Sequence, residues 1–317
     1  MALLDDGRTL VMAAERVDRR PFVDVPVDDV QAATRLAGRA ARHWGLDGPV
    51  ELERVGMNAV FSAGAVVVRV GRPNAPATAA LELARRLIEV GLRVPEPAAA
   101  DPVVDPESAM TATLWERVRP SGDAIDWRGV GESVARLHAA GSALVPDDHP
   151  CPSPTTFPWW DFDTLLDDVG DIVDRTALER LAATVERHRW WRDAVTEGAV
   201  VCHGDVHPGN VVPTSDGPVL LDWDLLCIAP PGWDHGPMMT WAERWGGVPG
   251  EYEAYAAGYG WSGRGDPFAE AVAELRLVAA TLMRVRAART DPAARSEAER
   301  RLAFWRGDRD APAWRAQ

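Results

Sequence analysis

The sequence predicts an α+β protein in which a small antiparallel sheet with one inserted helix precedes a larger, mainly helical part. Three observations lead to this fold class. Short, valine-rich segments of the strand type occupy the first third of the chain, helical periodicity dominates after residue 122, and an island of short strands at residues 199–226 interrupts the helices. Pro120-Ser121-Gly122 marks the change between the two patterns. We therefore expect a first domain over residues 1–118 and a second over residues 119–317.

The first domain is expected to begin with an amphipathic helix over residues 28–44, which Gly45 ends. A second helix over residues 78–90, ended by Gly91, is inserted between strands. The strand-type segments are rich in valine or other apolar residues and are bounded by turns. They cover residues 50–55, 59–61, 65–70, 98–104 and 109–118. These elements predict one antiparallel sheet that carries a single internal helix.

The second domain is expected to be helical around one β-hairpin. The turn Thr214-Ser215-Asp216-Gly217 folds residues 211–212 back on residues 219–221. A G-x-G-x-x-G pattern at residues 258–263 follows a helical segment instead of a strand, so we interpret it as a loop and not as a dinucleotide site. The predicted helices of this domain cover residues 127–140, 175–195, 251–257, 270–289 and 292–305.

The charge and composition of the chain exclude several classes of site. The 317 residues carry a formal net charge of −14, and because lysine is absent all 34 basic residues are arginine. A Walker A phosphate loop, a pyridoxal-phosphate Schiff base and a Ser-x-x-Lys acylase each require a lysine, so all three are excluded. The net negative charge also argues against a nucleic-acid partner.

The cysteines and the first residues predict a cytoplasmic protein. The three cysteines form an odd set without the C-x-x-C spacing of a metal site, which fits a reducing compartment; they are Cys151, Cys202 and Cys227. Residues 1–10 carry Asp5 and Asp6 where a secretory signal needs a basic patch and an apolar run. The longest uncharged stretch is too short and too rich in glycine to span a bilayer, so we expect no membrane partner. The oligomeric state is not predicted.

The side chains best suited to catalysis gather in the loop at residues 201–212. Phosphoryl transfer needs a carboxylate near the attacking hydroxyl group and oxygen ligands for Mg²⁺. Asp205 can supply the carboxylate. Asn210 and Asp222 can supply the ligands, because the predicted hairpin would bring them side by side. The sequence therefore predicts a magnesium-dependent phosphoryl-transfer site.

Two other interpretations of the same loop are open. The loop could be an ordinary connection whose Asp and Asn side chains serve as caps. It could also hold zinc or two metal ions in a hydrolase through His203, Asp205 and His207. The second alternative leaves Asn210 and Asp222 without a role.

His203-Gly204-Asp205, followed by Asn210 and Asp222, resembles the signature of the aminoglycoside phosphotransferase-like family, a branch of the protein-kinase-like fold. The resemblance covers most of the chain, because the order of sheet part, link and helical part is that of the family. It implies a two-lobed kinase-like fold. It further implies Asp205 as catalytic base or hydroxyl-orienting carboxylate, Asn210 with Asp222 as Mg²⁺ ligands, and Asp234 as a brace of the catalytic loop.

The same resemblance implies phosphate contacts in the first domain. Asn58 lies in a turn that is similar to the family's reduced glycine loop, although the turn alone would suggest only a hairpin. Arg69 lies on the following strand, where protein kinases use lysine, and its planar fork can bind two phosphate oxygens. Glu82 on the inserted helix would pair with Arg69, with Glu89 as the alternative. Arg69 and Glu82 could also be solvated surface charges.

The end of the last strand of the first domain looks like the hinge of the family. The base of ATP or GTP would bind there to the backbone of Glu116 and Val118. Trp115 would form a wall of this pocket, or else pack in the core.

The acceptor site of the family lies among helical insertions of the second domain. The candidate residues here are Trp159, Trp160, Asp161 and Asp163, together with the stretch at residues 241–253. Acidic residues beside tryptophans suit a cationic or sugar-like acceptor, although they could equally be solvated acids and packing aromatics. We expect an O-phosphotransferase that uses ATP or GTP together with Mg²⁺. Its acceptor would be a hydroxyl group of a small molecule such as an aminoglycoside or macrolide antibiotic. The alternatives are a sugar, choline-like or amino-acid acceptor, or a catalytically silent ligand-binding protein.

Overall fold

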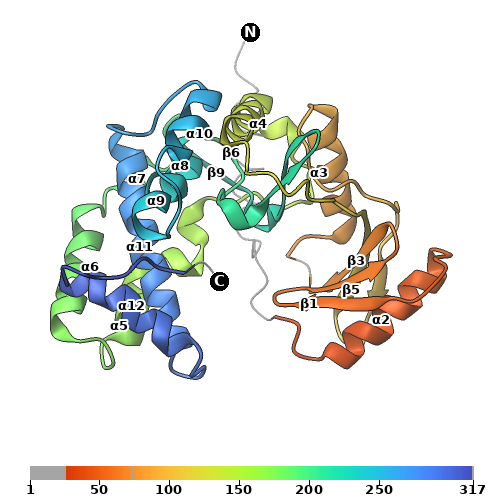
Figure 1. Cartoon of the computed structure of the whole chain (residues 1–317), viewed down its shortest axis with the longest axis horizontal. Helices are drawn as coiled ribbons and strands as arrows, with labels where there is room; N and C mark the ends of the chain where they lie inside the picture. The colour runs from red at the N-terminus through yellow and green to blue at the C-terminus, as the bar shows by residue number, and fades with distance from the viewer. Residues whose placement is uncertain (1–25, 73, 316–317) are drawn as a thin grey trace, which may run out of the picture. The chain divides into compact units, whose positions relative to one another are not determined.

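The computed structural model describes residues 26–72 and 74–315, which divide into two compact units (Figure 1). The first unit holds the described residues up to Asp126, together with Ala139–Pro152 and Val211–Leu226. The second holds Trp127–His138, Ser153–Asn210 and the described residues from Cys227 onward. The hairpin that we expected in the second domain therefore groups with the first. Residues 1–10, where the sequence predicts no secretory signal, lie outside the described residues.

The first unit contains the predicted antiparallel sheet, with strand order β1-β2-β3-β5-β4. Its strands are β1 (Glu51–Val55), β2 (Ala59–Ala63), β3 (Val66–Gly71), β4 (Val103–Asp105) and β5 (Met110–Glu116). β4 starts five residues later than expected, and Pro97 makes only an isolated bridge to Trp115. Pro97 and Pro102 lack the N–H group that a continuous ladder needs, which explains the late start.

The two helices predicted over residues 28–44 and 78–90 are confirmed as α2 (Val30–His43) and α3 (Ala77–Glu89). Asp29 caps α2 by accepting a hydrogen bond from the backbone of Ala32 at 2.8 Å. The apolar face of α2 packs on the buried face of the sheet, where Leu36 joins one core with Phe61 and Val68. A short 3₁₀ helix, η1 (Ser142–Leu144), also belongs to this unit.

The predicted hairpin consists of β7 (Val211–Thr214) and β8 (Gly217–Leu220), and Val211 lies opposite Leu220. Gly217 has a φ of 119°, a conformation that glycine adopts without a steric penalty. The hairpin groups with the first unit because its backbone bonds to it. Leu220 donates to the carbonyl of Arg93 at 2.9 Å, and Pro213 accepts from Ser121 at 2.9 Å.

The second unit is mainly helical and contains one two-stranded sheet, formed by β6 (Val200–Cys202) and β9 (Cys227–Ala229). Its helices are α4 (Trp127–Ala140, up to His138 in this unit), α5 (Phe162–Val169), α6 (Arg175–Arg187), α7 (Trp191–Ala194), α8 (Gly232–Met239), α9 (Trp241–Arg244), α10 (Glu251–Tyr259), α11 (Pro267–Ala287) and α12 (Ala294–Arg306). The 3₁₀ helices η2 (Pro154–Thr156), η3 (Pro158–Trp160) and η4 (Pro208–Asn210) complete it, while η5 (Trp223–Leu225) lies in the first unit. Among the described residues no helix combines the length and the apolar character needed to cross a bilayer.

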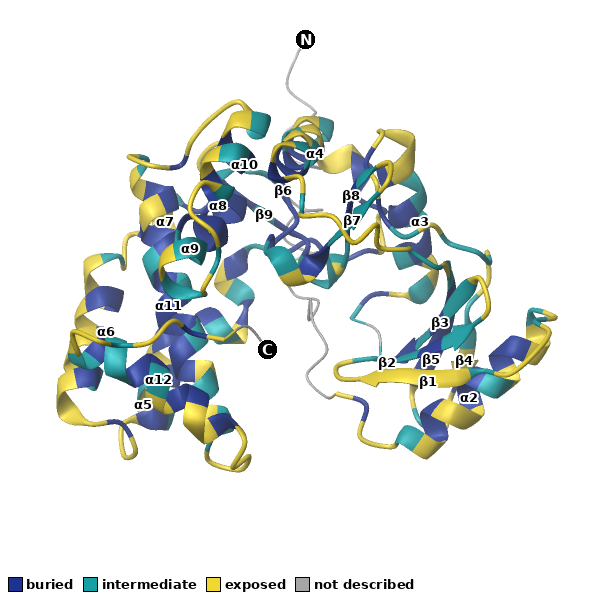
Figure 2. Cartoon of the chain, in the orientation of Figure 1, coloured by how far each residue is buried: buried dark blue, intermediate teal, exposed yellow. Residues whose placement is uncertain are grey.

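The helices of the second unit differ from the predictions in several places, and the short helices α5 and α9 were not predicted. The helix expected over residues 175–195 is two helices, α6 and α7. Helix α6 ends at Arg187, and the ring of the next residue, His188, bonds to Glu274 of α11 at 2.9 Å. Helix α8 was not expected, because it contains two glycines and Pro237, which are poor helix formers. These small residues allow close packing on α11: a Cβ on Gly236 would lie 2.6 Å from Val272. Figure 2 shows that α8 is buried throughout.

Gly258 and Tyr259, which open the G-x-G-x-x-G pattern, still lie in α10, and the chain from Gly260 to the start of α11 is the loop that the sequence analysis expected. A Cβ on Gly258 would overlap the backbone carbonyl of Arg128 in α4. We expect Gly258→Ala to lower the free energy of unfolding by about 1–3 kcal/mol, the usual cost of overpacking. Urea denaturation measures the change. Gly38→Ala is the control, because its Cβ meets only the flexible end of Arg42 at 3.8 Å, and an equal loss there would contradict the packing argument.

Candidate active site

The predicted catalytic loop begins at Cys202, where β6 ends. Helix α8 forms hydrogen bonds to the backbone of this loop. Asp234 of α8 accepts hydrogen bonds from the backbone N–H groups of His203 and Gly204, both at 2.8 Å. Gly204 has a φ of 89°, so the chain turns sharply just before Asp205. The bracing role implied for Asp234 is confirmed.

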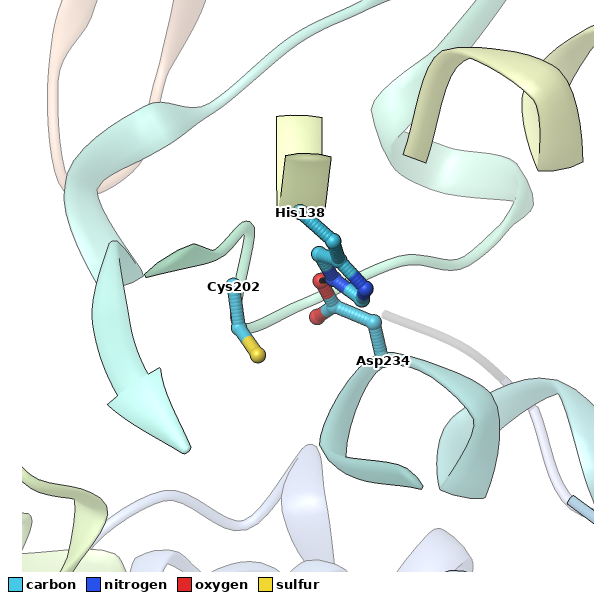
Figure 3. Close-up of side chains that lie close together, drawn as sticks. All are labelled: His138, Cys202 and Asp234. Atoms are coloured by element: carbon cyan, nitrogen blue, oxygen red, sulfur yellow. Dashed lines mark hydrogen bonds and ion pairs between the residues drawn. The ribbon is translucent and has the colours of Figure 1, made fainter. Parts of the chain in front are cut away.

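The brace has two further members, His138 and Cys202, which are buried beside Asp234 (Figure 3). His138 lies 3.0 Å from Asp234 through Nε2 and 2.8 Å from the Tyr259 hydroxyl through Nδ1. The Cys202 thiol donates to the carbonyl of Ala229 at 3.4 Å. These three side chains therefore tie β6, β9, α4 and α8 together at the base of the loop.

Burial and the close contacts shift the pKa values of the brace. Burial disfavours a charged imidazole, but hydrogen bonds to the Cys202 sulfur and to Asp234, together with the negative charge of Asp234, outweigh it and raise the pKa of His138 to about 10. Burial also opposes ionisation of Asp234, yet the hydrogen bond and charge of His138 hold the pKa of this carboxyl below its usual value. Burial raises the pKa of the Cys202 thiol, which stays protonated. The brace is a buried His–Asp ion pair beside a neutral thiol.

The described residues contain one group of three side chains that could hold a metal ion, formed by His138, Cys202 and Asp234. The atoms that would serve as ligands all lie within 4.8 Å of one another. Each is already bonded to a protein partner, so we assign the cluster a structural role. The set required by the hydrolase alternative, His203, Asp205 and His207, does not form such a group. His203 instead accepts a hydrogen bond from the backbone of Asp205 through Nδ1, at 3.3 Å.

Asp205, the predicted catalytic carboxylate, is held through both of its oxygens. Arg276 of α11 donates to Oδ1. On the other side, Oδ2 lies 3.3 Å from Nδ2 of Asn210 and 3.4 Å from Nε2 of His207. Burial opposes ionisation, but the charge of Arg276 and the contact with His207 hold the pKa of Asp205 well below its usual range. Asp205 is therefore an oriented anion with a side chain that is 23% exposed.

The contacts of His207 fix the orientation of its ring and the tautomer of its neutral form. The backbone N–H of Gly209 donates to Nδ1 at 3.0 Å, so the proton of a neutral ring lies on Nε2 and points toward Asp205. The ring stacks on Trp241 at 5.6 Å, and Trp241 stacks on Trp245 at the same distance. His207 thus shapes the loop and adds a hydrogen-bond donor beside Asp205.

In the first unit, Asn58, Arg69 and Trp115 lie around one small cavity of about 40 Å³, together with Asp224. Arg69 donates to the carboxylate of Asp224. It also donates to Oδ1 of Asn58 from Nε at 3.2 Å and Nη2 at 2.7 Å, in the amide orientation that these donors require. Burial opposes the charged form of Arg69, but Asp224 and Asp222 outweigh it and raise its pKa. The structure therefore brings together three of the predicted nucleotide residues.

The predicted pairing of Glu82 with Arg69 is wrong. Glu82 bonds to Arg86, one helical turn later in α3, at 3.0 Å. It also lies 3.8 Å from Arg85, and its side chain is 44% exposed. Local partners at i+3 and i+4 are available to Glu82 at little entropic cost, whereas Arg69 already bonds to Asp224. Within the part of the chain that the structure describes, Arg69 contacts Asp224 and Asn58, so the alternative pairing with Glu89 is not found either.

Arg69 contacts Asp224 and Asn58 through a planar guanidinium whose N–H groups point in fixed directions, a geometry that the compact ammonium group of lysine does not reproduce. We expect Arg69→Lys to raise the dissociation constant for nucleotide on the order of tenfold. Titration calorimetry measures this constant, and Arg54→Lys on the exposed strand β1 is the control. An unchanged affinity would mean that Arg69 merely follows the lysine-free composition of the chain.

The sequence missed Asp224 and Arg276. Asp224 could have been found, because it lies two residues after Asp222 in Asp-Trp-Asp. Asp222 itself has a φ of 61°, and with Ala109 it is one of two non-glycine residues of the described chain with positive φ. Such conformations concentrate at functional sites. Asp222 belongs to the first unit and Asn210 to the second, and their joint role in holding Mg²⁺ stays a prediction.

The candidate acceptor residues in η3 and at the start of α5 have structural partners. Trp160 is fully buried and packs on Trp191 and Trp233, with ring centres 5.1 and 4.4 Å away, so its expected contact with an acceptor is wrong. Asp161 caps α5 by accepting from Thr164, and Asp163 pairs with Arg189 at 3.2 Å. Trp159 stacks on Phe157 at 4.8 Å. Packing and helix capping explain the pattern that suggested a cationic acceptor.

A model of the phosphotransferase enzyme family matches residues 60–272, which include the braced loop and Asp205. The chain belongs to this family. The predicted resemblance is confirmed, and the protein is a phosphotransferase enzyme. A comparison with curated protein sequences gives no match.

Three solved structures illustrate the fold that this phosphotransferase shares. A choline/ethanolamine kinase family protein from Mesorhizobium loti is 18% identical with a TM-score of 0.65, over 87% of this chain and 93% of that one. An amicoumacin kinase in complex with AMP-PNP, Ca²⁺ and Ami is 14% identical with a TM-score of 0.64, over 87% and 95%. A spectinomycin phosphotransferase with ADP and spectinomycin is 14% identical with a TM-score of 0.63, over 88% and 99%. The predicted kinase-like α+β fold is confirmed.

Proposed function

We propose that this phosphotransferase transfers the terminal phosphoryl group of ATP or GTP, with Mg²⁺, to a hydroxyl group of a small molecule. The observation that carries the proposal is Asp205, an oriented carboxylate in the loop that Asp234 braces. Phosphoryl transfer depends on positioning and charge stabilisation more than on covalent chemistry by the protein. Asp205 would accept the hydrogen bond of the acceptor hydroxyl and direct its oxygen toward the phosphoryl group.

Asn210 and Asp222 are the residues that we propose as Mg²⁺ ligands. Both carry an oxygen atom of the type that Mg²⁺ prefers. The Nδ2 of Asn210 bonds to the carbonyl of Asp205 at 3.0 Å, which makes Oδ1 the atom for a cation. Asn210 directly precedes β7, and Asp222 follows β8 after one residue. An ion held by these two residues would supply positive charge that offsets the negative charge of the phosphate groups.

We propose that the nucleotide binds in the first unit. Arg69 and Asn58 would face the phosphates, and Trp115 would form a wall beside the base. The N–H of Glu116 donates to the carbonyl of Glu96 at 2.8 Å, so Glu116 would offer its carbonyl to the base and Val118 its backbone. The AMP-PNP and ADP in two of the similar structures support a nucleotide donor.

For the acceptor we propose an antibiotic such as an aminoglycoside or a macrolide, with a sugar, choline-like or amino-acid metabolite as the alternative. The amicoumacin kinase and the spectinomycin phosphotransferase among the similar structures make antibiotics the first group to test. Nucleotide and acceptor would be the partners of the enzyme, in the cytoplasm. A silent binding protein is the competing function, but such a protein has no need of Asp205, Asn210 and Asp222 together.

The test incubates the purified enzyme with Mg²⁺, ATP or GTP and a panel of these acceptors. Mass spectrometry then looks for the gain of one phosphoryl group. We expect one acceptor class to gain it, and we expect the gain to disappear on chelation of Mg²⁺ and in Asp205→Ala. Binding of nucleotide and acceptor without any consumption of nucleotide would instead favour the silent binding protein.

A further inference from the structure

We propose that Arg276 is a positioning residue of the phosphotransfer site, which acts by holding the carboxylate of Asp205 in the orientation that receives the acceptor hydroxyl. The inference rests on the proposed function and adds a residue to it. Arg276 lies beyond residues 60–272, the segment that the family model matches. It comes from α11, 71 residues after Asp205 in the sequence.

The contacts of Asp205 single out Arg276. The contacts on Oδ2, at 3.3 Å from Asn210 and 3.4 Å from His207, are longer than an ordinary hydrogen bond. The contact on Oδ1 joins a guanidinium to a carboxylate, a charge-assisted bond of the stronger type. Arg276 is therefore the main restraint on rotation of the carboxylate.

Arg276 is itself well placed to act as a restraint. Its Nη1 lies 3.4 Å from the carbonyl of Gly204, so the guanidinium contacts both the backbone and the side chain of the loop. Its neighbours Leu275 and Leu277 are buried, and its own side chain is 20% exposed. Arg276 thus starts from a helix that is fixed in the core and ends at the catalytic carboxylate.

The packing of two helices links this restraint to the brace. Helix α8 carries Asp234, which holds the backbone of the loop, and α11 carries Arg276, which holds its carboxylate. The two helices approach closely: a Cβ on Gly232 of α8 would lie 2.9 Å from Ala269 of α11. One helix pair therefore sets the position of both the loop and its functional group.

The positive charge has a second effect. A carboxylate beside a phosphoryl group repels it, and a fixed cation on the carboxylate reduces that repulsion. Arginine keeps its charge at any working pH and can contact Gly204 and Asp205 together through its planar fork. In a chain without lysine, Arg276 supplies this charge.

The test compares Arg276→Gln, Arg276→Lys and Arg286→Gln, with the acceptor that the panel identifies. Arg286 is the matched control, because it lies on the same helix and pairs with Asp168 at 3.4 Å, outside the loop. We expect Arg276→Gln to lower kcat by roughly 10- to 100-fold, the effect of one lost charge-assisted hydrogen bond, while KM for nucleotide and acceptor changes by less than about threefold. Arg276→Lys should recover part of kcat, and Arg286→Gln should behave as the wild type.

Chemical rescue separates positioning from general stability. Guanidinium ions at millimolar concentration should restore part of the kcat of Arg276→Ala and leave Arg286→Gln unchanged. The proposal is overturned if Arg276→Gln keeps the kcat of the control, if the loss lies in KM alone, or if neither lysine nor guanidinium restores activity to a folded variant. If the wild type transfers no phosphoryl group to any acceptor, the proposed function itself is wrong. That result is distinguishable from failure of the Arg276 proposal, which requires an active wild type and a comparison of variants.

Discussion

Replacing Asp205 by Asn is expected to reduce phosphoryl transfer by about 10²–10⁴-fold, the range for loss of a side chain that assists the reacting hydroxyl group. The amide keeps the size of the side chain but removes the negative charge that accepts the hydrogen bond of the hydroxyl group. The contact with Arg276 loses its ionic character at the same time. Single-turnover measurements with saturating nucleotide and acceptor would report this loss as a change in the transfer step.

The interpretation of Asp205→Asn depends on two controls. Asp216→Asn changes an equivalent carboxylate in the exposed turn between β7 and β8, and it should keep full activity. The affinity of Asp205→Asn for nucleotide should stay within about threefold of the wild type, because Asp205 is proposed to contact the acceptor hydroxyl, whereas Asn58, Arg69 and Trp115 are proposed to contact the nucleotide. Full transfer activity in a folded Asp205→Asn variant would remove Asp205 from the reaction.

Local sequence signals predicted the catalytic loop because its geometry is set within a few residues. The segment from His203 to Asn210 is short: it consists of a loop followed by one turn of 3₁₀ helix, η4, which ends at Asn210. The hairpin that follows depends on a four-residue turn with glycine at its end, a signal that is also local. The brace of the loop by Asp234 was implied by family resemblance and could not have been inferred from spacing alone.

The partners of the charged residues could not be predicted in the same way. The chain has 34 basic residues, and the one that meets Asp205 is decided by the packing of α11 on the rest of the unit. Glu82 illustrates the opposite error. A long-range partner was expected, but Arg86 lies one helical turn away and needs no tertiary structure to be in reach.

Tryptophans were misleading for a related reason. Trp159 and Trp160 are adjacent in the sequence, yet Trp160 is fully buried among aromatic rings and Trp159 is only partly buried. Both tryptophans lie in the 3₁₀ helix η3, and the backbone of η3 decides which of the two rings points into the core. Pro158 at the start of η3 signals a turn, but it does not indicate which side chains of that turn are buried. Burial of single side chains in irregular segments is therefore the part of the site that required the structure.

Asp234→Asn is expected to have the largest effect on stability and to lower the free energy of unfolding by about 3–5 kcal/mol, the usual cost of breaking a buried ion pair. Asp234 is fully buried and accepts from His203, Gly204 and His138. An amide replaces one accepting oxygen with an NH₂ group that faces another donor, so a buried polar group is left unsatisfied. Urea denaturation followed by tryptophan fluorescence would measure the loss.

The loss should also depend on pH. The pKa of His138 is raised from 6.5 to about 10, so the stabilisation by its charged form is fully present below pH 6.5 and is lost as the pH rises through about 10. The pKa of Asp234 is lowered from 3.8, so its contribution is present above pH 3.8 and is lost as the pH falls through the lower, folded-state value. The difference between wild type and Asp234→Asn should therefore be larger at about pH 6 than at about pH 9.

Glu274→Gln is the control for Asp234→Asn, because it removes the carboxylate of an exposed histidine–carboxylate pair instead of a buried one. Glu274 also faces a histidine, His188, at 2.9 Å, but its side chain is 46% exposed. Water and salt screen such a pair, so Glu274→Gln should cost less than about 1 kcal/mol. If both variants lost the same small amount at pH 6, the His138–Asp234 pair would not hold the loop. Because Asp234 also fixes the backbone of His203 and Gly204, such a result would weaken the argument that α8 positions Asp205 for phosphoryl transfer.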